Sequence, residues 1–141
     1  MTYDNVLQWL FAVLNADTAL VALVGGTKNI GRYDDELPSV TGVYVNVPEQ
    51  TRDERFACTV DVTVNIYSSE GESECAALLD HVATLLDQEP GDPKSWTPMP
   101  GTYGFNLYWL KTQSVTTPER DGEPDNGYSA TLKLAVRCSS A

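Results

Sequence analysis

The stretch from Arg55 to Tyr67 constrains the fold more than any other part of the sequence. The apolar residues of this stretch share one parity: Phe56, Cys58, Val60, Val62, Val64 and Ile66. Strand side chains point alternately to opposite faces, so the pattern predicts a strand with an apolar face on a core and a polar face toward water or a partner. At about 3.3 Å per residue the strand would span about 40 Å, well beyond the usual length. Such a strand suggests a protein that works through its surface rather than through a pocket.

Three further segments are predicted to be strands. Gly42–Glu49 alternates valine with polar residues, and Pro48 is expected to end this strand or to lie on a sheet edge. Phe105–Thr117 is apolar on both parities at its start, so we expect this half to be buried on both sides. Tyr128–Cys138 alternates again, with Thr131, Lys133 and Arg137 on the outward side. We expect two antiparallel hairpins, one on each side of a central helical segment.

Helical spacing of apolar residues appears first at Asp4–Asn15. Trp9 and Val13 lie beside the apolar stripe of this segment. They either widen its buried face or form a second face that meets another subunit.

Two further helices have recognisable ends. Asp17 is expected to cap a short helix over residues 18–24, and Gly25-Gly26 to stop it. Residues 69–72 have the spacing of a capping box, so we expect a long amphipathic helix from there to about Gln88.

Two loops connect these elements. Residues 27–42 hold a brief extended segment at Ile30–Tyr33, followed by the acids Asp34–Glu36. These acids form either a solvated turn or a metal or partner site, and calcium-loop spacing does not follow them. Residues 89–104 are rich in proline and glycine but keep the large apolar side chains Trp96, Met99 and Tyr103. We therefore expect an ordered loop that packs on the domain or docks to a neighbour.

Together these segments predict an α+β fold in a single domain, residues 1–141. It consists of a mostly antiparallel four-stranded sheet, two N-terminal helical segments and one long covering helix. A chain of 141 residues is long enough for one hydrophobic core.

The chain carries 20 acidic and 9 basic residues, a formal net charge of −11. This charge argues against a protein that binds the nucleic-acid backbone, which requires clustered Lys and Arg. It is compatible with high solubility, with a surface past which DNA slides, or with DNA mimicry. No apolar run approaches the roughly 20 residues of a membrane-spanning helix, and no signal peptide is visible at the start. We expect a soluble protein made in a cytoplasm.

Residues able to do chemistry are few and scattered. His81 is the one histidine, and neither a nucleophile motif nor paired carboxylates accompany it. We expect it to be a partly exposed helix residue, and we expect no enzymatic activity, no metal site and no cofactor. Cys58 and Cys138 fall at inward strand positions. They form a disulfide if their strands pair and the compartment is oxidising, or remain buried thiols.

The order of these segments resembles the tail terminator (tail completion) proteins of long-tailed bacteriophages, a group that includes the minor tail protein U of phage lambda. The segments that carry the resemblance are Leu14–Gly26 (LNADTALVALVGG), Arg32–Asp34 with Pro38 before Val43–Val45, Val60–Ser68 (VDVTVNIYS), and Thr117–Gly122 (TPERDG) before Tyr128–Leu134 (YSATLKL). Their order and spacing carry the resemblance rather than any one motif. Residues 89–104 depart from the family pattern in length, so no family contact is transferred to them.

The resemblance implies a structural virion protein that is assembled in the host cytoplasm and resides in the tail or neck. It implies a ring, typically a homo-hexamer, that caps the tail tube, stops its elongation and presents a surface for joining the head. The implied partners are further copies of the chain, the tail tube protein and a head-completion or connector protein, while DNA passes through the ring without specific binding. No membrane partner is implied.

The candidate contact residues for such a ring lie at the two hairpin tips and on the central strand. They are Arg52, Asp53, Glu54, Arg55, Asp61, Arg120 and Asp121. The tips mix both signs of charge, which suits docking to a neighbour or to the tube, although ordinary solvated turns have the same composition. Asp61 either anchors a neighbouring chain or discourages edge pairing.

Two other functions remain open from the sequence. Another head–tail connector or neck protein would have a similar size, and binding to DNA-filled heads rather than to tail tubes would distinguish it. An acidic DNA mimic would need its acids spaced like phosphates on one face, whereas here they are scattered over turns and helix starts.

Overall fold

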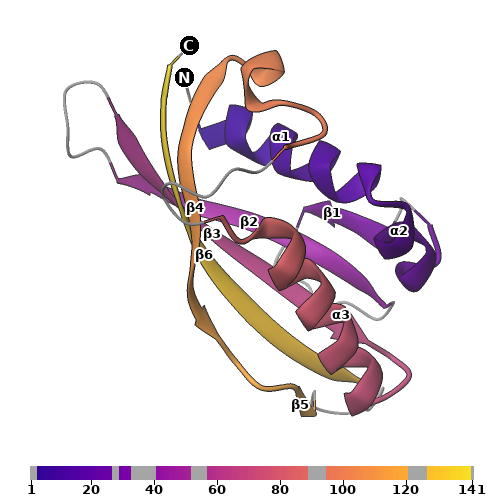
Figure 1. Ribbon diagram of the computed structural model, residues 1–141. Helices are drawn as coiled ribbons and strands as arrows, with labels where there is room; N and C mark the ends of the chain where they lie inside the picture. Colours follow the sequence, from indigo (N-terminus) through magenta and orange to yellow (C-terminus); the bar gives the residue numbers. More distant parts are fainter. Residues whose placement is uncertain are drawn as a thin grey trace.

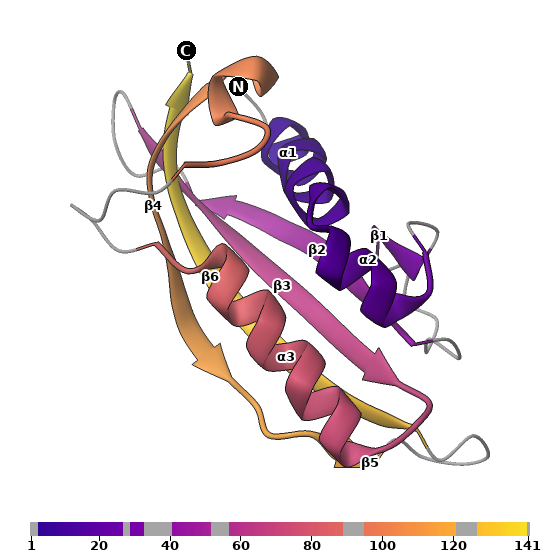
Figure 2. The same ribbon diagram turned by 45° about the vertical axis from the view of Figure 1, so that its right-hand side comes forward.

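The computed structural model places all of its helices on one face of a mixed, mostly antiparallel β-sheet (Figures 1 and 2). It describes residues 3–26, 29–32, 41–51, 57–88, 95–120 and 127–140. The elements in chain order are α1 (Tyr3–Ala16), α2 (Thr18–Val24), β1 (Ile30–Arg32), β2 (Gly42–Thr51), β3 (Cys58–Ser68), α3 (Glu72–Leu86), the 3₁₀ helix η2 (Pro100–Tyr103), β4 (Phe105–Val115), β5 (Glu119–Arg120) and β6 (Tyr128–Ser140). The predicted α+β class is confirmed.

The sheet has the strand order β1-β2-β3-β6-β4, and β5 pairs with β6 beside this path. The two predicted hairpins are confirmed, because β2 pairs with β3 and β4 pairs with β6, all antiparallel. The predicted number of four strands is too low, because β1 joins β2 in parallel and β5 adds a short pairing. Strand β1 confirms the brief extended segment expected at Ile30–Tyr33, but its pairing with β2 was not predicted. Segments of three and two residues are too short to show the alternation that identifies a sheet strand in a sequence.

Strand β3 lies at the centre of the sheet, as its pattern predicts. Residues 58, 60, 62, 64 and 66 are buried, and their neighbours from 59 to 65 are only partly buried. The predicted start at Arg55 lies outside the described residues, which resume at Ala57. Tyr67 is the exception to the alternation, since its side chain is 2% exposed on the otherwise polar face.

Strand β2 continues past Pro48 to Thr51. Of the two alternatives for Pro48, the one in which it ends the strand is therefore wrong. Among the described strands β1 pairs only with residues 43–45 of β2, so Pro48 lies where one side of β2 is a sheet edge, as the second alternative predicts. The register of β2 on β3 shifts between Asn46 and Glu49. This irregularity accommodates a residue that has no N–H to donate to the ladder.

Helices α1 and α3 cover the apolar face of the sheet, with α1 over β2 and α3 over β3 and β6 (Figure 2). The hydrophobic core therefore lies in one layer between these helices and the sheet. Trp9 and Val13 belong to this core, with exposed fractions of 0% and 3%. The alternative in which these two residues widen the buried face of the helix is therefore confirmed. The opposite face of the sheet carries no helix among the described elements.

The ends of α2 form as predicted, and the start of α3 does not. Asp17 Oδ1 accepts a hydrogen bond of 2.8 Å from the Leu20 N–H, and Gly25 closes the helix in the left-handed conformation. The prediction of a capping box over residues 69–72 is wrong, because α3 begins at Glu72 with Gly71 as its N-cap and no side-chain cap. The Ser69 N–H is instead bonded to Thr41 Oγ1, which fixes the turn that leads from β3 into the helix.

The described part of the proline-rich loop packs on the domain. The Trp96 ring meets the Trp9 ring edge-to-face at 5.0 Å, and Tyr103 is partly buried against the core. Trp9 Nε1 donates a hydrogen bond of 2.9 Å to the carbonyl oxygen of Pro98. Met99 remains 69% exposed. Within residues 95–104, packing on the chain's own core is therefore the arrangement that the structure adopts.

Strand β4 changes its register on β6 between Leu107 and Trp109. The extra residue turns both Tyr108 and Trp109 to the helix-free face, whereas Leu110 returns to the core. Tyr108 is 52% exposed. The prediction that this half of the strand is buried on both sides is therefore wrong.

Candidate functional site

Side chains that could support catalysis do not converge in the described residues. No three His, Cys, Asp or Glu side chains there are grouped so that they could hold a metal ion. His81 Nε2 lies 3.1 Å from Asp17 Oδ1, and its side chain is 31% exposed, as predicted for a partly exposed helix histidine. The hydrogen bond from the Leu20 N–H, assisted by His81, holds the pKa of Asp17 below its usual value. The Asp17 carboxylate thus serves to cap α2 and to tie it to α3.

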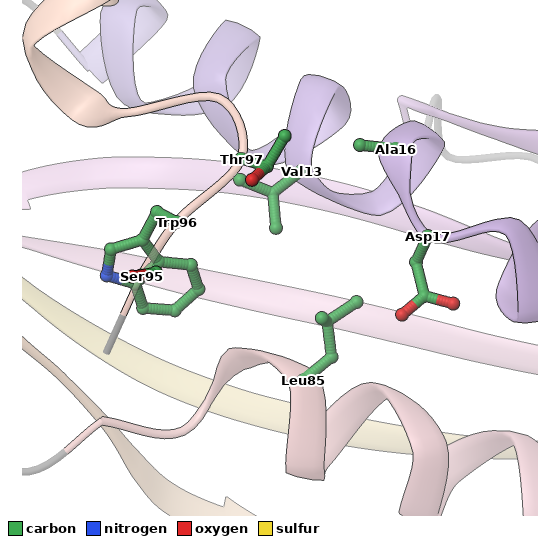
Figure 3. A pocket seen from close by; sticks show the side chains of 7 residues that line it. All are labelled: Val13, Ala16, Asp17, Leu85, Ser95, Trp96 and Thr97. Carbon is green, nitrogen blue, oxygen red and sulfur yellow. The ribbon is translucent and has the colours of Figure 1, made fainter. Parts of the chain in front are cut away.

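A hollow beside this carboxylate is too small and too sparsely polar for a typical ligand (Figure 3). Its volume is about 210 Å³, whereas ligand pockets usually measure about 300 to 1,000 Å³. It is lined by Val13, Ala16, Asp17, Leu85, Ser95, Trp96 and Thr97. Figure 3 shows Asp17 as the one charged side chain in this lining, and its Oδ1 atom is already bonded to the Leu20 N–H and to His81.

Cys58 and Cys138 lie opposite each other on β3 and β6, as the sequence allowed, and both are free thiols. Their sulfur atoms are 3.8 Å apart. Burial, with a smaller effect from Cys58, raises the pKa of Cys138 to about 12. A thiol held protonated in this way is a poor nucleophile, so the pair packs the core.

Most of the predicted contact residues lie outside the described structure. Four residues of the first tip, Arg52 to Arg55, and Asp121 of the second tip are not among the described residues. Arg120 lies in β5 opposite Tyr128, and Asp61 lies on β3 opposite Ala135. The positions opposite Arg120 and Asp61 are thus about 23 Å apart along β6, so these two residues do not form one patch.

The helix-free face of the sheet carries a different group of residues, on the half formed by β6 and β4. We call it the open β6–β4 face, and it consists of Tyr108, Trp109, Lys111, Lys133 and Arg137. The Lys111 ammonium lies 5.4 Å from the centre of the Trp109 ring. Arg137 lies between Thr59, whose hydroxyl it contacts at 3.0 Å, and Trp109 on the opposite strand. The Tyr108 hydroxyl is 2.8 Å from Ser139 Oγ.

The sequence indicates only part of this face. The alternation of the last strand places Lys133 and Arg137 on the outward side, and the structure confirms both positions. The two aromatic residues were missed, because the bulge that turns them outward leaves no signal in the pattern of β4.

Aromatic and arginine side chains on an uncovered surface are typical of protein–protein contacts rather than of catalytic sites. Among the described helices, none is by itself long and apolar enough to cross a membrane, while the bent pair Asn5–Ala16 and Thr18–Val24 passes that test jointly.

A family model described as tail completion protein gp17 matches residues 8–135, which is most of the chain. No curated protein matches the sequence at a significant level.

Proposed function

Because the chain belongs to the tail completion protein gp17 family, we propose that it forms a ring that caps the tail tube of a long-tailed phage and ends tube elongation. Membership of this family makes it a non-enzymatic structural protein of the phage tail that acts with other tail components. The ring, its hexameric size, its place at the neck and its head-joining surface are the proposed part. The match over residues 8–135 is the observation that carries this proposal.

A closed ring requires a contact between two different surfaces of the same protein. Pairing along the middle of the β4 edge is disfavoured, since the backbone groups of Leu110 and Thr112 are already bonded within the chain. The Leu110 N–H donates to the Gln88 carbonyl oxygen at 3.0 Å, and the Thr112 N–H donates to Asp87 Oδ1 at 3.1 Å. This arrangement favours contacts made by side chains of a sheet face over the addition of a strand.

The net charge of −11 supports a ring whose channel repels DNA and lets it pass without binding. In this proposal acidic side chains line the channel. A structure of the assembled ring in which neutral or basic side chains face the channel would exclude it.

The proposed partners are further copies of this chain, the tail tube protein and the head-completion or connector protein. The test is tube assembly from purified tube protein, followed by electron microscopy of tube lengths. Addition of this protein during growth is expected to stop elongation, so that the mean tube length becomes fixed at the time of addition. Continued growth at saturating protein, or binding to DNA-filled heads in place of tubes, would overturn the proposal.

A further inference from the structure

The open β6–β4 face is the one uncovered surface of the described structure that combines two outward aromatic rings with three bases. Among the described residues, neither Lys111 nor Lys133 forms an ion pair with a carboxylate. The described acids on the strands that pair with β6 are Asp61 of β3, opposite Ala135, and Glu119 of β5, opposite Ser129. At about 3.3 Å per residue, Lys133 and Arg137 stand about 13 Å apart along β6, which is enough to contact a helix laid across the strands.

The outer side of α3 has complementary properties. The side chains there are exposed and small or acidic: Glu72, Ser73, Ala77, Asp80 and Thr84. The helix contains no Lys or Arg, so its permanent charges are all negative. Small side chains let another surface approach the helix backbone closely, and the acids are opposite in charge to the bases of the open β6–β4 face.

These two surfaces lie on opposite sides of the molecule, because α3 covers the apolar face of the sheet and the open β6–β4 face is its reverse (Figure 2). The open β6–β4 face and the outer side of α3 therefore cannot contact each other within one chain. They can contact each other between two copies, and such a contact joins two different patches, as a ring requires.

From this geometry we infer that, in the ring, the open β6–β4 face of one copy packs on the acidic outer side of α3 of the next copy. Lys133 and Arg137 face the acids of α3, and Trp109 lies over its small residues. The inference rests on the proposed ring and names the surfaces that close it. A second copy is favoured over nucleic acid as the occupant, because 20 acids against 9 bases repel phosphates outside this small face.

The test is a charge exchange followed by light scattering after gel filtration, with the wild-type protein expected near 92 kDa, about six times the chain mass of 15.4 kDa. Lys133→Glu and Asp80→Lys each place like charges in contact and are expected to weaken assembly by about tenfold or more. The double variant K133E/D80K restores opposite charges across the contact and is expected to assemble again.

The matched control is K133E/E70K, which restores the net charge with Glu70, an exposed residue of the turn between β3 and α3. It is expected to remain as weak as Lys133→Glu alone. Circular dichroism of each variant verifies that the monomer is folded.

Assembly of the wild type with no effect of either single change would overturn this contact and leave the ring intact. The same holds if K133E/D80K fails to assemble while its circular dichroism is native. A wild type that stays monomeric alone and on tail tubes would overturn the ring itself. Double-stranded DNA binding that is lost in Lys133→Glu, measured by gel shift, would assign the face to nucleic acid instead.

Discussion

Cys58 lies directly opposite Cys138 on the antiparallel strands β3 and β6, with 3.8 Å between their sulfur atoms. Both side chains are buried in the core, with exposed fractions of 4% and 0%. The position of the pair therefore follows from the register between β3 and β6. The reactivity of the two thiols tests whether these strands are packed.

The first prediction concerns the reactivity of these thiols. Because burial raises the pKa of Cys138 to about 12, its thiolate fraction at pH 8 is about a thousandfold below that of an ordinary cysteine. We expect iodoacetamide to label Cys58 and Cys138 of the native protein far more slowly than in guanidinium chloride, as measured by mass spectrometry. Rapid labelling of either residue in the folded protein would contradict the packing of β3 on β6.

The second prediction concerns the cap of α2. Asp17→Ala removes the acceptor for the Leu20 N–H and is expected to cost about 1 kcal/mol in urea unfolding at neutral pH. Asp17→Asn keeps an N-cap acceptor and is expected to lose less. The folded pKa of Asp17 is lowered, so its ionisation adds stability above its unfolded pKa and this part is lost as pH falls through the folded pKa. A difference between wild type and Asp17→Asn that grows in acid would contradict the assignment.

The third prediction separates two tryptophans. Trp9 is fully buried and packs edge-to-face on Trp96 and Phe105, so Trp9→Ala is expected to cost about 3 to 5 kcal/mol of unfolding free energy. Trp109 is only partly buried on the helix-free face, outside the core, so Trp109→Ala is expected to cost much less unfolding free energy than Trp9→Ala while it weakens assembly. A large fall in the monomer's stability with Trp109→Ala would show that this ring belongs to the core.

The fourth prediction concerns a close approach between Gly127 and Tyr67. A Cβ at residue 127 would overlap the hydroxyl and ring atoms of Tyr67, whose side chain is fully buried. Gly127→Ala is therefore expected to lower the melting temperature by several degrees, because the ring must move. Gly101→Ala is the matched control, since a Cβ there would meet no atom within 4 Å. Equal melting temperatures for the two variants would refute the contact.

The fifth prediction retains the first hairpin tip as a candidate contact. Reversal of charge at Arg52 and Arg55 is expected to weaken ring or tube association while the monomer stays folded, because a segment that mixes both signs of charge suits docking. Co-sedimentation with tail tubes measures the first effect and circular dichroism the second. Unchanged association would remove this tip from the interface.

Features set by local chemistry were predictable from the sequence. The alternation of Val60, Val62 and Val64 places β3 with one face in the core, and Asp17 caps its helix with the expected bond to Leu20. These patterns depend on the period of one element and on side chains within one turn of it.

Features set by pairing between distant segments were not predictable. The parallel contact of Ile30 with Val43 requires a partner strand that a three-residue segment does not reveal. The bulge at Tyr108 inverts the parity of β4 and turns Trp109 outward, so the open β6–β4 face emerges only when β4 is laid against β6. The capping-box pattern at Ser69 failed because Thr41, far away in the chain, takes the Ser69 N–H.

Electron microscopy of tail tubes mixed with the purified protein, with averaged images of the tube ends, decides whether this protein caps the tube. We expect one additional ring-shaped layer at one end of each tube, with the symmetry of a hexamer, absent when the protein is omitted. Tube ends that remain unchanged at saturating protein would contradict the proposed cap.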